Sequence, residues 1–369
     1  MQGFLRLMVR VLTVLAMLPL LSVHAQTAGK KAHPQVPVTY AGDTQEDIAR
    51  RAQWIEGAKK EGMLVWWGIL NPNESKPLIA KFNKLYPFIK VEYWRGRGEE
   101  IAAKLEAEYA GSRPVVDFCY GGAPENNPRW AKMGMIEKFT EIVPGIEKFD
   151  KRTYGKRGDW VIPGLAPKVP QYNTNLISAA EAPKSFEDLL DPKWKGQMGV
   201  EVESENWSTL ALSEGGWGIE KTEAFLTKLK AQTPRSITGG TAAHSLLIAG
   251  EFKILAMGNL RHVLVSQAKK APVDWVKVDP VLVTGPAFIL MKKASHPNAA
   301  RLFLEWQLSN QGLPAWAEVS HHYVSTVTSP MSRLLEGRNL IVRTEEVVLK
   351  GIEMGLIKRF NKSFFGIED

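Results

Sequence analysis

Helical segments and short apolar segments alternate along most of this sequence, and that order restricts the chain to few folds. A helix over 45–61 is followed by an apolar strand over 63–67, and a helix that Pro87 ends is followed by an alternating strand around 91–93. A βαβα order of this kind is typical of mainly parallel sheets with helices on both faces, which bind ligands at the carboxyl ends of their strands. The pattern therefore predicts an α/β fold.

The alternation forms two series. The first continues with a helix over 99–109 and a buried strand over 115–120, and the second begins after Pro170. The elements predicted in the second series are a strand over 198–202, a helix over 221–231, a helix ending near Gly250, strands over 253–257 and 288–291, and a helix carrying Ala299, Ala300, Phe303, Leu304 and Leu308. Because 369 residues are about twice the usual size of one domain, we expect two lobes.

Residues 1–25 have the features of a secretory signal peptide. Two arginines precede an apolar run over 11–21 that is too short to span a bilayer comfortably, and small residues lead up to Ala25. We predict cleavage after Ala25, with an uncleaved membrane anchor as the alternative. Residues 26–44, which contain prolines among polar side chains, are expected to form a flexible leader.

Composition limits the function further. Hydrophobic residues make up 44% of the chain and charged residues 23%, which excludes a disordered or coiled-coil protein. Loss of the signal peptide lowers the net charge from +8 to +6, and no Lys/Arg cluster typical of nucleic-acid binding is present. The single cysteine, Cys119, excludes an internal disulfide and Cys-rich zinc modules. We therefore expect a soluble periplasmic protein that binds no nucleic acid.

Six segments together resemble one family of proteins. They are residues 58–62 (AKKEG), 82–91 (FNKLYPFIKV), 171–175 (QYNTN), 182–196 (APKSFEDLLDPKWKG), 249–251 (AGE) and 295–312 (SHPNAARLFLEWQLSNQG). Their order over nearly all of the mature chain resembles the extracellular solute-binding proteins of bacterial ABC importers, in the branch that includes ferric-ion, putrescine, thiamine and aminoethylphosphonate binders.

The resemblance implies a two-lobed periplasmic-binding-protein fold of type II, in which the lobes close on a ligand about a hinge. It also implies delivery of a small molecule to an ABC transporter permease, no cofactor and no enzymatic activity, and we expect a monomer. The segment 172–175 joins the two series without an obvious helix, as a crossover between lobes would, and 284–287 is its partner. We assign residues 45–170 plus 285–369 to lobe 1 and residues 171–284 to lobe 2.

Four residues of lobe 1 are candidates for ligand binding. Trp67 lies where the first strand ends, although packing in the core would explain it as well. Arg97 and Gly98 open a helix whose free backbone N–H groups attract anions, and the alternative for Arg97 is a solvated ion pair with Glu99 or Glu100. Gly122 follows the strand over 115–120 and either presents a backbone amide to the ligand or forms a tight turn.

Six residues of lobe 2 are further candidates. Trp207 and Ser208 are predicted in a loop leading into a helix, with Ser208 as an anion donor or an N-cap. The full set in this lobe is Tyr172, Trp207, Ser208, Thr241, Arg261 and His262. Arg261 and His262 follow the strand over 253–257, where the resemblance implies iron-ligating tyrosines in ferric-binding relatives, and they suit a carboxylate or phosphonate. The alternative is a surface helix.

Other ligands and other functions have less support in the sequence. No two tyrosines are adjacent and none lies between Tyr172 and Tyr323, which argues against bare ferric ion. His321 and His322 have no third ligand spaced with them, so we interpret them as a surface pair and predict no metal site. No Gly-x-Ser-x-Gly elbow is present, and Cys119 lies within an apolar strand. The sequence favours a small organic anion as ligand. The alternatives are a ferric-ion, metal-chelate or polyamine binder of the same fold, or a secreted enzyme.

Overall fold

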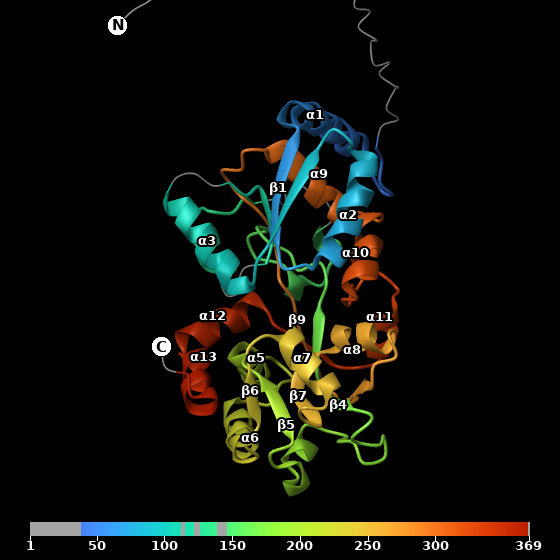
Figure 1. Cartoon of the computed structure of the whole chain (residues 1–369). Helices are drawn as coiled ribbons and strands as arrows, with labels where there is room; N and C mark the ends of the chain where they lie inside the picture. Colours follow the sequence, from blue (N-terminus) through green and yellow to red (C-terminus); the bar gives the residue numbers. More distant parts are fainter. Residues whose placement is uncertain (1–37, 112–114, 122–125, 139–145, 368–369) are drawn as a thin grey trace, which may run out of the picture. The chain divides into compact units, whose positions relative to one another are not determined.

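A computed structural model describes residues 38–111, 115–121, 126–138 and 146–367, and it contains two β-sheets (Figure 1). The first has four strands in the order β10 (Phe288–Leu290), β3 (Phe118–Tyr120), β1 (Met63–Gly68) and β2 (Lys90–Arg95). Strands β1, β2 and β3 are parallel, whereas β10 is antiparallel to β3. This is the parallel sheet that the βαβα order predicts.

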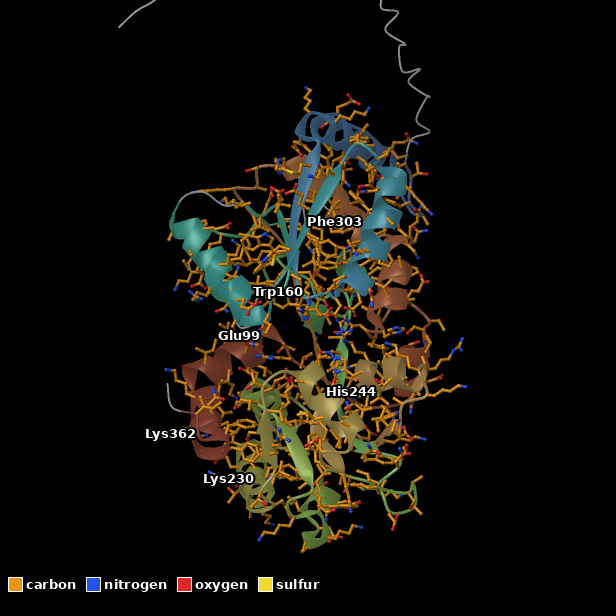
Figure 2. All side chains as sticks on the ribbon, viewed as in Figure 1. Glu99, Trp160, Lys230, His244, Phe303 and Lys362 are labelled. Carbon is orange, nitrogen blue, oxygen red and sulfur yellow. The ribbon has the colours of Figure 1, made fainter. Side chains whose placement is uncertain are left out.

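Helices cover both faces of the first sheet because the side chains of β1 alternate between two cores. Trp66 packs with Phe303 of α9, their ring centroids 5.0 Å apart, while Trp67 belongs to the core that contains Ile101 and Leu105 of α3. Figure 2 labels Phe303 within the first of these cores. The helices in this part of the chain are α1 (Gln45–Glu61), α2 (Pro72–Leu85), α3 (Gly98–Ala110), α4 (Asn127–Lys132), α9 (Pro297–Leu308) and α10 (Gly312–Ser320).

The second sheet has seven strands. Its order is β11 (Leu340–Val342), β9 (Val281–Thr284), β4 (Ala166–Asn173), β7 (Ile254–Asn259), β5 (Met198–Glu201) and β6 (Arg235–Ile237), and β8 (Val273–Trp275) also pairs with β4. Strands β5, β6 and β7 are parallel, and β4 is antiparallel to β7 with Lys168 opposite Asn259. The beginning of β4 therefore lies at the edge where β7 ends.

Seven helices accompany the second sheet in the described ranges. They are α5 (Ser204–Leu212), α6 (Ile219–Ala231), α7 (Gly240–Ala249), α8 (Leu260–Gln267), α11 (Pro330–Leu335), α12 (Glu345–Glu353) and α13 (Leu356–Phe360). Short helical turns complete the described chain at Ile146–Lys148, Lys151–Thr153, Glu187–Leu190, Pro192–Trp194 and Asn361–Phe365. None of the helices within the described ranges is long and apolar enough to cross a membrane.

The sheets correct part of the lobe assignment. Residues 285–369 do not all accompany the first sheet, because β11 pairs with β9 of the second sheet and both α12 and α13 pack against α5. The predicted boundary at 170/171 falls inside β4, which is part of the second sheet from Ala166 onward. The return crossover lies as predicted between β9, which ends at Thr284, and β10 of the first sheet.

The predicted flexible leader is also shorter than the sequence suggested. Tyr40 is buried in the first core, and Asp43 forms an ion pair with Arg51 of α1. Helix α1 begins after Thr44, whose side chain accepts a hydrogen bond from the Asp47 backbone N–H. Residues 38–44 are therefore fixed to the fold, whereas the predicted signal peptide and residues 26–37 lie outside the described residues.

Candidate functional site

The carboxyl ends of the strands in the first sheet bring the side chains of Tyr120 and Glu74 near each other. Strand β3 ends at Tyr120, and β1 leads through Ile69 into α2, with the Ile69 backbone N–H donating to the Tyr120 carbonyl oxygen at 3.1 Å. Glu74 lies in the first turn of α2 and accepts a hydrogen bond from the Asn71 backbone N–H at 2.7 Å. This cap directs the helix N-terminus and Glu74 to the edge where ligands bind in parallel sheets.

The second sheet contributes the start of α8 to the site. Strand β7 ends at Asn259, whose side chain accepts a hydrogen bond from the Arg261 backbone N–H at 3.1 Å and so caps the helix without an intervening loop. Arg261 and His262 are consequently held at the end of β7, where the sequence predicted them.

Arg261 connects the two sheets through an ion pair. Its guanidinium donates to Glu74 Oε1, and the side chains of Arg261 and Glu74 are only 16% and 11% exposed. Within the described part of the chain, Glu74 is the one hydrogen-bond partner of the Arg261 side chain. The predicted alternative, a solvated arginine on a surface helix, is therefore wrong.

Three buried polar groups near Arg261 lack a hydrogen-bond partner among the described residues. They are the Nδ1 atoms of His262 and His322 and the hydroxyl of Tyr120. Burial lowers the pKa of His262 and of His322 well below 6.5, and the charge of Arg261 lowers both further. Burial raises the pKa of Tyr120, and Arg261 opposes that shift. The three groups are neutral near pH 7, and each unsatisfied group costs about 1–3 kcal/mol unless a water or ligand atom pairs with it.

His322 reaches this position because the crossover into β4 packs tightly. Leu165 and Tyr323 exchange two backbone hydrogen bonds of 2.7 and 2.8 Å, which bring the segment after α10 against Gly164. A Cβ atom on Gly164 would lie 2.9 Å from Cβ of His322, so only glycine allows this approach. The interpretation of His321 and His322 as a surface pair is therefore wrong for His322, which is 4% exposed.

A second group of charges lies at the same edge of the second sheet. Lys168 of β4 is buried, donates a hydrogen bond to Glu203 and lies 3.6 Å from Glu201 Oε2. Burial disfavours the charged Lys168, but the two carboxylates outweigh it and raise its pKa. Burial raises the pKa of Glu201 to about 7. The start of α7 lies so close to the Glu201 carboxylate that a side chain on Gly240 would collide with it.

The remaining lobe 1 candidates have the following places in the structure. Trp67 is 3% exposed and stacks with Lys104, whose Nζ lies 4.5 Å from the ring centroid, as the packing alternative describes. Arg97 is 68% exposed and pairs with Glu100 at 3.0 Å, which is the solvated ion pair named as its alternative. Gly98 begins α3 as expected. Gly122 lies outside the described residues.

Several lobe 2 candidates lie away from Arg261. Trp207 packs with Phe225 in the second core, their ring centroids 5.7 Å apart. Ser208 is not an N-cap, because α5 begins at Ser204 and Ser208 is buried in its middle. Tyr172 lies opposite Ile254, at the start of β7, and thus at the other edge of the sheet from Asn259.

Thr241, by contrast, is an exposed residue in the first turn of α7, whose start borders Glu201.

Sequence reasoning missed four residues of the site. They are Glu74, Tyr120, Lys168 and His322. A lysine within an otherwise buried strand is a usable signal for Lys168, since lysine is almost never buried without a partner. Glu74 gives no such signal because Asn-x-x-Glu before a helix reads as an ordinary cap.

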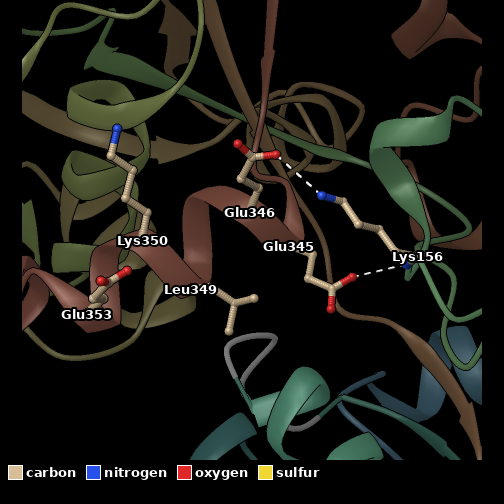
Figure 3. Close-up of a pocket in the computed structure, with 6 residues that line it drawn as sticks. All are labelled: Lys156, Glu345, Glu346, Leu349, Lys350 and Glu353. Atoms are coloured by element: carbon tan, nitrogen blue, oxygen red, sulfur yellow. Dashed lines mark hydrogen bonds and ion pairs between the residues drawn. The ribbon is translucent and has the colours of Figure 1, made fainter.

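Other cavities lie elsewhere in the molecule. One of about 380 Å³ borders α12, where Glu345 accepts from the Lys156 backbone N–H and Glu346 pairs with the Lys156 ammonium (Figure 3). Another of about 650 Å³ borders Arg51 and Glu305, which are paired with each other. In the described ranges, no three His, Cys, Asp or Glu side chains are grouped so that they could hold a metal ion.

Two solved structures illustrate the similarity of fold. The periplasmic binding protein AfuA from Actinobacillus pleuropneumoniae, with fructose-6-phosphate bound, has a TM-score of 0.69 and 20% identity over 82% of this chain and 98% of its own. Iron-bound HitA from Pseudomonas aeruginosa has a TM-score of 0.65 and 21% identity over 80% and 98%. These likenesses show the fold, which is the predicted periplasmic-binding-protein fold.

Sequence comparison reaches the family. An uncharacterized protein of Haemophilus influenzae is 25% identical over 255 residues, which are 65% of this chain and 72% of that protein. A sequence model of the family described as bacterial extracellular solute-binding protein matches residues 125–342, more than half of the chain. The protein therefore belongs to the bacterial extracellular solute-binding proteins, the family of ABC importer receptors that its sequence resembles.

Proposed function

We propose that the protein binds a small organic anion between the two sheets and delivers it to an ABC transporter permease. The observation that carries the proposal is the set of polar groups around Arg261. Within the described ranges, the arginine side chain has one partner, Glu74, and it stands among groups of Tyr120, His262 and His322 that have no partner there. Arginine pairs well with carboxylate, phosphate and phosphonate groups, because its planar fork donates two parallel hydrogen bonds.

The neutral groups around Arg261 suggest which chemical groups the ligand carries besides its anionic group. The imidazoles of His262 and His322 and the Tyr120 hydroxyl can each donate or accept a hydrogen bond. A bare apolar carboxylate would leave them unpaired, whereas an anion with hydroxyl groups would pair with them. We therefore expect a hydroxylated carboxylate, phosphonate or phosphate ester. The fructose-6-phosphate named for AfuA is one compound of this kind.

The alternatives have weaker support in the site. A polyamine needs free carboxylates, but Glu203 is held by Lys168 and Glu74 by Arg261. HitA carries iron, yet the tyrosine pair expected of a ferric site is missing from this sequence. For an enzyme, burial raises the pKa of the Cys119 thiol, so it is not activated as a nucleophile.

Family membership implies a periplasmic location, and it makes a permease the partner. Cleavage after Ala25 and a monomeric state complete the proposal. Ligand binding is proposed to close the lobes about the crossovers near Ala166 and Thr284, with α12 and α13 moving together with the second sheet.

Calorimetric titration of an Arg261→Gln variant tests the anion site. A thermal-shift screen of carboxylates, phosphonates, sugar phosphates, amines and metals first identifies a ligand. Loss of a charge-assisted hydrogen bond worth about 1.5–3 kcal/mol should weaken its binding roughly ten- to a hundredfold. Arg235→Gln is the matched control, since Arg235 forms an exposed ion pair with Glu251 on the same sheet.

Two outcomes would contradict this function. Unchanged affinity in Arg261→Gln would remove the arginine from the site. Recovery of a chemically altered ligand after incubation with the protein, measured by mass spectrometry, would favour the secreted enzyme instead.

A further inference from the structure

The Glu74 carboxylate is positioned from its own helix. Oε2 accepts the Asn71 backbone N–H at 2.7 Å, while Oε1 accepts the Arg261 guanidinium. The side chain therefore bridges a helix cap of the first sheet and the start of α8 in the second. It fills the place opposite Arg261 that the anionic group of a ligand would need.

The charges and unpaired groups around this pair favour exchange of Glu74 for another anion. Positive charge nearby comes from Lys168, which is held by Glu201 and Glu203, while His262 and His322 are neutral. Arg261 has further N–H groups beyond the one that Glu74 uses, and the unpartnered groups around it can receive a ligand. A ligand with an anionic group can thus take the arginine while Glu74 keeps its bond to the cap.

We propose that Glu74 is a displaceable counter-ion, which occupies Arg261 in the unliganded protein and gives way to the anionic group of the ligand. This inference rests on the proposed function. Because the competing carboxylate belongs to the same molecule, its effective concentration is high and it excludes weakly bound anions. Glu74 thereby acts as a specificity-determining residue that sets a threshold of charge and hydrogen bonding for the ligand.

A Glu74→Gln variant tests the proposal with inorganic phosphate as the probe. The amide oxygen of glutamine can still accept the Asn71 N–H, so α2 keeps its cap, but the negative charge is gone. We expect phosphate at pH 7.5 to bind about tenfold more tightly than to the parent, measured by titration calorimetry. We also expect a lower melting temperature without phosphate, since Arg261 loses its counter-ion. Glu318→Gln, which removes an exposed carboxylate paired with Lys81, should change neither quantity.

The outcomes separate this inference from the function on which it rests. Phosphate binding that is weaker or unchanged in Glu74→Gln, combined with weaker binding in Arg261→Gln, would contradict the proposed role of Glu74. The anion site at Arg261 would remain supported. Weaker binding in both variants would show that Glu74 orients Arg261 for the ligand instead of competing with it. If phosphate stabilises neither the parent nor Glu74→Gln, or binds Arg261→Gln as tightly as the parent, both proposals fail.

Discussion

Two arginines of this protein, Arg51 and Arg261, have opposite surroundings. Arg51 of α1 uses all five guanidinium N–H groups, donating twice to Asp43, twice to Glu305 and once to the Val38 carbonyl oxygen. Among the residues that the structure describes, the Arg261 side chain has one partner, Glu74, and stands beside polar groups that have none. A saturated network fixes structure, whereas an unsaturated one reserves hydrogen bonds for a ligand.

The same contrast divides the histidines. His244 of α7, labelled in Figure 2, has both ring nitrogens paired: Nδ1 lies 2.8 Å from Gln171 Oε1 and Nε2 lies 2.8 Å from the Ser266 hydroxyl. Gln171 donates its amide N–H to the Asn259 carbonyl oxygen, so its Oε1 accepts and His244 Nδ1 carries the proton. His262 and His322 each keep an unpartnered Nδ1. The comparison predicts that changes at Arg51 and His244 affect stability and that changes around Arg261 affect binding.

The largest effect is expected from Arg51→Met. Asp43 would lose its cation and Glu305 would keep only the more distant Arg50, at 3.8 Å, and breaking a buried ion pair typically costs about 3–5 kcal/mol of unfolding free energy. Urea denaturation measures this loss, and Lys59→Met on the same helix is the control because Lys59 forms an exposed ion pair with Glu56. Phosphate affinity should stay at the parent's value. A small stability loss accompanied by weaker phosphate binding would reverse the comparison.

A smaller effect is expected from acidification through His244. Burial lowers the pKa of His244 from 6.5 to about 4, so the unfolded chain takes up a proton at higher pH than the folded protein does. The contribution of the neutral imidazole is complete above about pH 6.5 and declines as the pH falls toward 4, by about 3 kcal/mol in all.

The His244→Asn variant isolates this contribution. The difference in unfolding free energy between the parent and His244→Asn should shrink between pH 7 and pH 4, as measured by denaturant titrations at each pH. A constant difference would mean that His244 titrates equally in both states.

The smallest effect is expected from Arg97→Gln. Its side chain is 68% exposed and its pair with Glu100 is a surface ion pair, so unfolding free energy should change by less than about 1 kcal/mol. Phosphate affinity should change less than about twofold, which is a small part of the 1.4 kcal/mol of binding free energy that a tenfold change represents. A loss as large as that of Arg261→Gln would instead show that α3 brings Arg97 onto the anion.

Most of the fold could be predicted because its local signals agree. Gly62 ends α1 in a left-handed conformation at φ 66°, as the predicted helix boundary implies, and the apolar run that follows it forms β1. The sequence did not indicate which of the two sheets β11 joins. Three apolar residues carry no information about which sheet edge they join, and that choice depends on tertiary packing against β9.

The candidate site was predictable only in part, for a similar reason. Arg261 follows a strand directly, so strand-end reasoning finds it. Trp207 and Ser208 were misplaced because the helix that contains them starts earlier than the sequence indicates. Glu74 and His322 become part of a site only when α2, α8 and the segment after α10 meet, and no local pattern records such a meeting.

The placement of β11, α12 and α13 has a consequence for how the protein matures. A polypeptide is made from its N-terminus, so β4 to β9 are present well before residue 340. Until then the outer edge of β9 is open and the surface of α5 that α12 and α13 cover is bare. The second sheet is therefore completed only after Leu340 has been made, and a chain interrupted before Leu340 would present an unpaired strand edge to other chains and to proteases.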